Sequence, residues 1–184
     1  MEKVFQLKIQ LRGIEPPIWR RVLVPADFTL YQLHKVIQIV MGWWDYHLHE
    51  FVIDGKRYGR PVESIWEDEK VYDENEYRLK DLIKRAGKKF MYEYDFGDSW
   101  RHDIKVEKTL KKTPDLVVPQ CIDGERAAPP EDVGGIPGYY GLVEAMKNPG
   151  SEDYEYFIEW LGEEYDPETF DMDEINRKLK KLKS

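Results

Sequence analysis

Segments that alternate apolar and polar side chains come in adjacent pairs along this chain, and this feature constrains the fold most strongly. Residues 5–11 alternate strictly, and residues 18–24 follow after the breaker-rich loop 13–17. Residues 89–96 and 100–107 form a second pair. A period of two is typical of half-buried strands, and consecutive strands usually lie side by side. Such pairs argue against a doubly wound parallel sheet, in which helices separate the strands.

One strong helix is predicted between the two strand pairs. Apolar residues recur at helical spacing over residues 30–41, with Thr29 as a candidate N-cap and Gly42 after the last turn. Residues 47–53 then return to alternation, and an Asp-Gly pair follows as a hairpin signal. The sequence therefore predicts a main helix that packs on a sheet.

The rest of the chain is less regular. Residues 63–76 are acidic and are expected to form an exposed loop, and residues 79–86 a short helix. Three helices are expected near the C-terminus, over residues 139–147, 152–161 and 172–182.

We therefore expect a single α+β domain over residues 1–184. Its core of residues 1–108 holds a mixed or mostly antiparallel sheet packed on one main helix. A long Pro/Gly loop follows over residues 109–138, where no period is sustained. The helical C-terminal part, residues 139–184, is expected to cover an edge of the sheet.

Composition and charge narrow the classes of function. A hydrophobic content of 41% suits a packed core, and the single cysteine excludes an internal disulfide framework and a four-cysteine zinc site. The net charge of −8 disfavours nucleic-acid binding, although Arg20, Arg21 and the C-terminal lysines form local basic groups. Neither an apolar run long enough to span a bilayer nor an apolar signal core is visible, so we expect a cytoplasmic protein.

The turn between the last two predicted strands concentrates candidate chemistry. Asp95, Asp98 and His102 surround Gly97 within about one turn. Their oxygen and nitrogen donors suit Mg, Mn or Zn, or a general base with its orienting carboxylate. The structural alternative is a plain turn, in which the aspartates accept backbone hydrogen bonds, Gly97 takes a positive φ and His102 packs on a strand face.

A second candidate is the histidine pair His47 and His49, preceded by Trp43 and other aromatic residues. In a strand, residues two apart lie on one face, so both rings would reach a single ion. The alternative is that these histidines only pack or lie on the surface. The aromatic residues form either a ligand wall or the rim of the core.

The long loop supplies a thiol and several carboxylates that would close over a site built by the sheet. Cys121 would need a neighbouring base and a lowered pKa to act as a nucleophile, and an inert buried thiol is the alternative. The complete candidate pocket comprises Trp43, His47, His49, Asp95, Asp98, Trp100, His102, Cys121, Glu125 and Asp132.

Several segments together resemble a known family. They are Pro17-Ile18-Trp19-Arg20-Arg21, Leu33-His34-Lys35-Val36-Ile37-Gln38, Met41-Gly42-Trp43, His47-Leu48-His49-Glu50-Phe51, Tyr94-Asp95-Phe96-Gly97-Asp98-Ser99-Trp100-Arg101-His102, and residues 119–135. The chain resembles the plasmid pRiA ORF-three-like family, whose members are also labelled transposon-passenger TnpR-like proteins. The resemblance implies an α+β domain and carries neither an established activity nor agreed catalytic residues.

Three hypotheses of function follow. The leading one is a soluble binding or accessory domain with no assignable reaction, whose partner is a small molecule or a peptide. The second is a metal-dependent hydrolase or nuclease-like enzyme in which Asp95, Asp98 and His102 hold a divalent metal. The third is an accessory protein of DNA mobility that touches DNA through Arg20, Arg21 and the C-terminal lysines.

Overall fold

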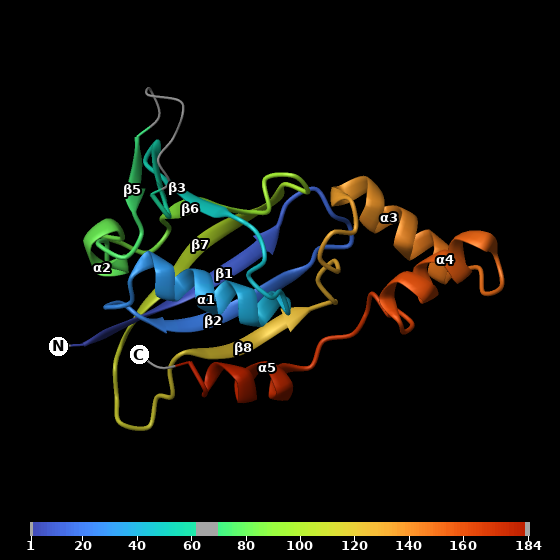
Figure 1. The fold of residues 1–184 in the computed structure, drawn as a ribbon. Helices are drawn as coiled ribbons and strands as arrows, with labels where there is room; N and C mark the ends of the chain where they lie inside the picture. Colours follow the sequence, from blue (N-terminus) through green and yellow to red (C-terminus); the bar gives the residue numbers. More distant parts are fainter. Residues whose placement is uncertain (1, 62–69, 183–184) are drawn as a thin grey trace.

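The computed structural model describes residues 2–61 and 70–182, and within them one sheet dominates the molecule (Figure 1). Its strand order is β5-β4-β3-β6-β7-β1-β2-β8, with every neighbouring pair antiparallel except β4 and β5. The strands are β1 Lys3–Leu11, β2 Trp19–Pro25, β3 His49–Ile53, β4 Lys56–Gly59, β5 Val71–Asp73, β6 Lys89–Tyr94, β7 Trp100–Lys111 and β8 Gln120–Glu125. The predicted α+β class is confirmed.

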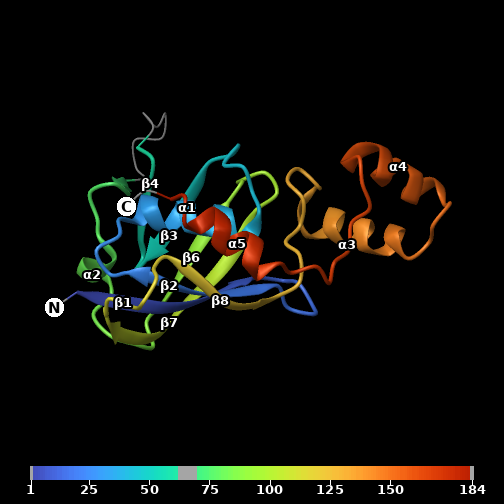
Figure 2. The same cartoon turned by 90° about the horizontal axis from the view of Figure 1, so that it is seen from below.

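Five helices accompany this sheet in the part of the chain that is described. They are α1 Leu30–Met41, α2 Leu79–Leu82, α3 Gly135–Met146, α4 Glu152–Leu161 and α5 Met172–Leu179. Helices α1 and α5 lie on the same face of the sheet, where α5 runs along the edge strand β8 and touches α1 (Figure 2). Helices α3 and α4 pack on each other and extend beyond the end of the sheet.

The main helix forms where the sequence predicts it. Thr29 caps its first turn, with Gln32 closing a reciprocal capping box, and Gly42 ends it at φ 76°. Its buried face includes Leu33 and Ile37, each of which contributes about 1.5–3 kcal/mol of burial free energy. The same face also buries His34, a polar residue.

The sheet has one packed face and one solvated face. Along β7, Trp100, His102 and Ile104 are buried, whereas the intervening Arg101 and Asp103 are exposed. Antiparallel sheets commonly face water on one side, and the alternation of apolar and polar side chains in the sequence indicates that arrangement. Side chains that form a site on the packed face must therefore lie among the apolar side chains of the core.

Two of the segments expected as loops contain strands. Strand β8 lies inside the expected loop 109–138, because Cys121 pairs with Val22 of β2, which is distant in sequence. Strand β5 lies inside the expected loop 63–76, where it pairs with β4; residues 63–69 of that loop lie outside the described part. In both cases a partner distant in sequence, rather than local periodicity, makes the strand.

Three helix boundaries also differ from the prediction. The short helix expected over residues 79–86 ends at Leu82, and the last one, expected to reach residue 182, ends at Leu179. Helix α3 begins at Gly135, four residues earlier than expected, after Gly134 takes a left-handed conformation at its N-cap. Two glycines at the start hide the helical pattern.

Candidate functional site

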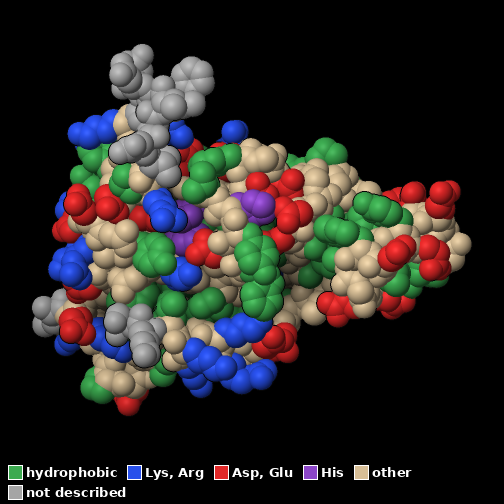
Figure 3. All heavy atoms as spheres, in the orientation of Figure 1, with side chains coloured by type: hydrophobic (Ala, Val, Ile, Leu, Met, Phe, Trp, Pro, Cys, Tyr) green, Lys and Arg blue, Asp and Glu red, His purple; other side chains and the backbone are tan. Residues whose placement is uncertain are grey.

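A hollow of about 490 Å³ opens beside the start of β3, where the chain segments around residues 31, 45–49, 60 and 74–75 meet. Figure 3 shows histidine side chains in the middle of this face, with acidic and hydrophobic side chains around them. We call it the histidine hollow. It is lined by Tyr31, Asp45, Tyr46, His47, Leu48, His49, Arg60, Glu74 and Asn75.

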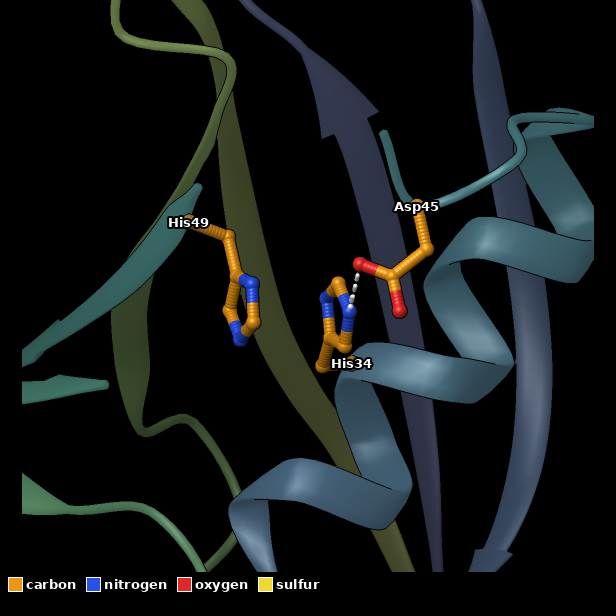
Figure 4. A group of neighbouring side chains, drawn as sticks. All are labelled: His34, Asp45 and His49. Atoms are coloured by element: carbon orange, nitrogen blue, oxygen red, sulfur yellow. Dashed lines mark hydrogen bonds and ion pairs between the residues drawn. The ribbon is translucent and has the colours of Figure 1, made fainter. Parts of the chain in front are cut away.

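Two imidazole–carboxylate pairs, which we call the inner cluster, lie at the floor of the hollow: His34, Asp45, His49 and Glu74. Asp45, His49 and Glu74 line the hollow, whereas His34 is fully buried. His34 Nε2 lies 2.8 Å from Asp45 Oδ1, and His49 Nε2 lies 2.6 Å from Glu74 Oε2. The two rings stack, with centroids 3.4 Å apart and planes 4° from parallel (Figure 4). Helix α1 supplies one ring and β3 the other, so the packing of helix on sheet creates the cluster.

A chain of hydrogen bonds runs from the core to the surface through His34. Gln38 Nε2 donates to the Tyr92 hydroxyl (3.1 Å), which lies 2.8 Å from His34 Nδ1. The neutral imidazole therefore accepts from Tyr92 at Nδ1 and donates from Nε2 to Asp45. The backbone N–H of Asp45 donates in turn to Gln38 Oε1 (2.9 Å), which closes the chain.

Burial and pairing shift the pKa values in this chain. Burial lowers the pKa of His34, although its bond to Asp45 opposes that shift. Burial alone would raise the pKa of Asp45, but hydrogen bonds from His34 and Lys35 and the charge of Lys35 hold that pKa below its usual range. Burial also raises the pKa of Tyr92 well above 10. The structure thus favours a neutral imidazole beside an ionised Asp45.

The stacked rings do not suit one shared metal ion. Nitrogen and oxygen atoms of His34, Asp45 and His49 lie within 4.8 Å of one another, which by distance alone resembles a metal site. An imidazole nitrogen, however, binds a metal through a lone pair in the plane of its ring. Two parallel planes 3.4 Å apart have no common point for the ion. The inner cluster is therefore arranged for hydrogen bonding rather than for shared coordination.

A second group, which we call the outer cluster, contains His47, Asp95 and Asp132. His47 Nε2 lies 2.7 Å from Asp132 Oδ1 and 3.5 Å from Asp95 Oδ2. Asp132 belongs to the segment 126–134, which connects β8 to α3. Both aspartates have a positive φ, 58° for Asp95 and 60° for Asp132, a conformation that aspartate adopts more readily than most residues.

Further hydrogen bonds hold the proline-containing segment 126–134 against the sheet. The indole N–H of Trp43 donates to the carbonyl of Pro129 (2.9 Å), and the Tyr94 hydroxyl donates to Glu131. The backbone N–H of Gly134 donates to Asp98 Oδ2 (3.1 Å). The turn around Gly97, His47 and the proline-containing segment, which lie far apart in sequence, therefore meet in one place.

The predicted trio of Asp95, Asp98 and His102 does not converge. Among the described residues, neither group of closely spaced metal-ligand atoms contains Asp98 or His102. Asp95 Oδ1 accepts turn N–H bonds from Gly97 and Asp98, as the structural alternative expected. The positive φ falls on Asp95 and Ser99 rather than on Gly97, which corrects that alternative. The hydrolase hypothesis in this form lacks its metal centre.

His102 is fully buried on the core side of β7, where Nδ1 contacts the carbonyl of Tyr92 (3.3 Å). Burial lowers its pKa to about 4. The pair of His47 and His49 also separates: His47 precedes β3 and joins the outer cluster, whereas His49 begins β3 and joins the inner one. The same-face rule fails here because it requires both residues to lie within a strand.

The remaining pocket candidates have structural contacts. Trp43 and Trp100 are buried and stack with centroids 6.3 Å apart, so they belong to the core. Burial raises the pKa of Cys121, and Asn176 hydrogen-bonds both its N–H and its carbonyl (2.8 Å each), which supports the inert thiol. Glu125 is exposed at the end of β8 and accepts from an indole N–H of β2 (3.2 Å).

Three of the basic groups proposed to touch DNA, Arg20, Arg21 and Lys178, make contacts within the protein. Arg20 is buried, donates to three backbone carbonyls, and burial lowers its pKa to about 10. Arg21 forms a bidentate ion pair with Glu107 (2.7 and 3.1 Å). Lys178 forms an ion pair within α5, and Lys183 lies outside the described residues. The two arginines that the DNA hypothesis names are therefore bound within the protein rather than available to phosphate.

Sequence reasoning missed three of the four residues of the inner cluster: His34, Asp45 and Glu74. His34 carries a local signal, because it falls among the buried positions of a strongly amphipathic helix, where an imidazole needs polar partners. Glu74 carries no such signal: it lies in an acidic segment that was expected to be exposed, yet it is only 2% exposed. Its pairing with His49 becomes visible only in the folded chain.

A family model described as plasmid pRiA4b ORF-3-like protein matches residues 3–174, so the chain belongs to this family. The resemblance of the quoted segments is thereby confirmed. The described residues contain no helix that is long and apolar enough to cross a membrane.

Two relatives extend this result. The uncharacterized protein y4hQ of Sinorhizobium fredii is 36% identical over 181 residues, covering 97% of this chain and 92% of that protein. The crystal structure of MM3350 from Methanosarcina mazei Go1, a protein of unknown function, superposes with a TM-score of 0.83 at 39% identity, covering 94% of this chain and 97% of that one. These relatives assign no reaction to the family, which leaves function to be argued from the site.

Proposed function

We propose that the protein is a binding module that holds a small polar ligand in the histidine hollow. The observation that carries this proposal is the contrast between the floor and the rim of the hollow. Burial of Glu74 at the floor, and of His34 in the same cluster, removes ionisable groups from water at a free-energy cost. Tyr46 and Leu48, by contrast, are 70% and 48% exposed at the rim. Exposed apolar groups around convergent polar groups are typical of ligand sites.

The size of the hollow suits a small molecule. Its volume of about 490 Å³ lies within the range of about 300–1,000 Å³ that is common for such sites. Leu48 and Tyr46, which line the hollow, belong to the loop before β3 and are exposed apolar side chains. A ligand over the inner cluster would cover part of this apolar surface.

The floor favours a ligand that carries a cationic hydrogen-bond donor. Asp45 and Glu74 place carboxyl oxygens, which accept hydrogen bonds, at the floor, and Tyr31 offers an aromatic face. Lys35 already makes the contact that we infer for the ligand: its Nζ lies 3.0 Å from Asp45 Oδ2 and 5.7 Å from the Tyr31 ring centroid. Carboxylates and aromatic faces both stabilise a cation, so an amine or guanidinium compound is the ligand class that we infer.

Calorimetric titration with agmatine and propylamine, and with glutarate as an anionic comparison, tests this proposal. Saturable binding of the cationic probes is expected, and Glu74→Gln should weaken it at least about tenfold because the variant removes the charge and keeps the shape. Asp115→Asn, an exposed aspartate in the loop between β7 and β8, is the matched control and should bind like the parent protein.

Two results would overturn the proposal. One is the absence of saturable binding by either cationic probe in protein whose melting transition shows it to be folded. The other is binding of lysine-containing peptides without binding of any free amine, which would assign the hollow to a peptide segment instead.

A further inference from the structure

We propose that the outer cluster, His47, Asp95 and Asp132, binds one divalent cation such as Zn²⁺ or Mn²⁺, and that this ion fastens the segment 126–134 to the sheet. One imidazole nitrogen and two carboxylate oxygens come from three separate parts of the chain. Nitrogen and oxygen donors of these types suit divalent transition metals. His47 also lines the histidine hollow, but the inference does not rest on the ligand proposed there.

The distances between the donor atoms fit one ion. Donors bound at about 2.0–2.2 Å to a tetrahedral or octahedral ion lie about 2.8–3.6 Å from one another. His47 Nε2 lies 2.7 Å from Asp132 Oδ1 and 3.5 Å from Asp95 Oδ2, close to the two ends of that range. All three ligand atoms lie within 4.8 Å of one another. Small side-chain adjustments would therefore complete the coordination.

The direction of the His47 contact favours coordination over a simple ion pair. Nε2 is buried and makes no hydrogen bond within the described part of the chain, although Asp132 Oδ1 is only 2.7 Å away. In an imidazolium–carboxylate pair the N–H would point at the oxygen. Two ligand atoms that both point at one ion lie close together, but neither lies along the hydrogen-bond axis of the other. The short contact between His47 Nε2 and Asp132 Oδ1 fits that arrangement.

Neighbouring hydrogen bonds hold the aspartates in place. Asp95 uses Oδ1 to accept from the backbone N–H groups of Gly97 and Asp98 (3.0 and 3.3 Å), which leaves Oδ2 directed towards His47. Next to Asp132, Glu131 accepts from the Tyr94 hydroxyl. Such partners fix the orientation of metal ligands.

The cluster is open enough for exchange of the ion and for bound water. The side chain of Asp95 is 9% exposed, that of His47 is 30% exposed and that of Asp132 is 60% exposed. Three protein ligands with an open side allow water to fill the remaining positions. Of the three proposed ligands, Asp132 is the one that belongs to the segment 126–134. The ion would therefore add a strong cross-link between that segment and the sheet.

Calorimetric titration of chelator-treated protein with ZnCl₂ and MnCl₂ tests the site, with the absorption spectrum of the Co²⁺ form as a second readout of coordination. One ion should bind per chain, and His47→Gln and Asp132→Asn should each weaken binding at least about tenfold. His49→Gln, which alters only the inner cluster, and Asp115→Asn should leave the affinity unchanged. Melting curves without metal verify that every variant is folded.

Limited proteolysis provides the structural readout. In the parent protein the ion should slow cleavage within the segment 126–134, and in Asp132→Asn it should not. The proposal is overturned if the parent binds no ion with unit stoichiometry, if His47→Gln and Asp132→Asn both retain its affinity, or if His49→Gln abolishes binding.

Discussion

The inner and outer clusters use the same kinds of side chain and contain histidines only two residues apart, His49 and His47, yet they differ in chemistry. In the inner cluster the rings stack, both imidazole–carboxylate contacts are hydrogen bonds, and His34, His49 and Glu74 are at most 8% exposed. In the outer cluster His47 faces two carboxylates without a hydrogen bond at Nε2, in a setting open to solvent. Ring orientation and burial, rather than residue type, thus decide whether a histidine–carboxylate group fixes a core or leaves donor atoms free for an ion.

The two clusters also differ in what they contribute to stability. Removing one partner of a buried pair leaves the other without compensation and costs several kcal/mol, whereas exposed pairs contribute little. Glu74 and His34 fall in the first class. His47 and Asp132 fall in the second, so an ion at the outer cluster would find side chains that the fold does not otherwise require.

The largest effect is expected from His34→Ala. The variant removes a fully buried ring, its stacking on His49 and its bonds to Tyr92 and Asp45, so the free energy of unfolding should fall by about 4 kcal/mol. Urea unfolding followed by tryptophan fluorescence measures this loss. A decrease below about 1 kcal/mol would show that the inner cluster does not stabilise the core.

Acidification should produce the next largest effect. His102 has a pKa near 4 in the folded chain, against about 6.5 when unfolded, so between these values the unfolded chain binds more protons. The contribution of neutral His102 to the free energy of unfolding is complete above pH 6.5. This contribution is lost as the pH falls towards 4, and the total loss is about 3 kcal/mol. The lowered pKa of His34 acts in the same direction.

Unfolding free energies measured across this pH range test the prediction. His102→Phe keeps an aromatic ring and removes the titrating group, so its profile should be flatter than that of the parent. An equally steep profile in this variant would assign the acid sensitivity to other groups.

The smallest effect is expected from His47→Ala in the presence of a chelator. Because its side chain is partly exposed and its partner Asp132 is well exposed, the free energy of unfolding should change by only about 0.5 kcal/mol. Thermal and urea unfolding measure it beside His34→Ala. A loss comparable to that of His34→Ala would remove the distinction between the two clusters.

Much of the fold follows from local patterns, and less of the site does. The capped helix α1 and the strand pairs β1–β2 and β6–β7 are where the periodicity predicts them, because each carries its own alternation or capping signal. Strands β5 and β8 escaped prediction because their pairing partners β4 and β2 define them. The family was recognisable from ordered motifs, although these assign no reaction.

For the candidate site, the residue types were largely predictable and their groupings were not. His47, His49, Asp95 and Asp132 were all singled out, yet His47 and His49 separate into different clusters. Glu74 was assigned to an exposed loop because nothing near it in sequence indicates that it pairs with His49. Such pairings join elements distant in sequence, and a local pattern carries no information about them.

The sequence by itself determined the α+β class, the main helix and its caps, the strand pairs and the family, because periodicity and capping act over a few neighbouring residues. Only the tertiary structure decided that α1 and β3 stack His34 on His49, and that the segment 126–134 brings Asp132 to His47. Strand register and helix docking set these contacts through the burial of the whole core, so the chemistry of each histidine is defined by residues distant from it in sequence.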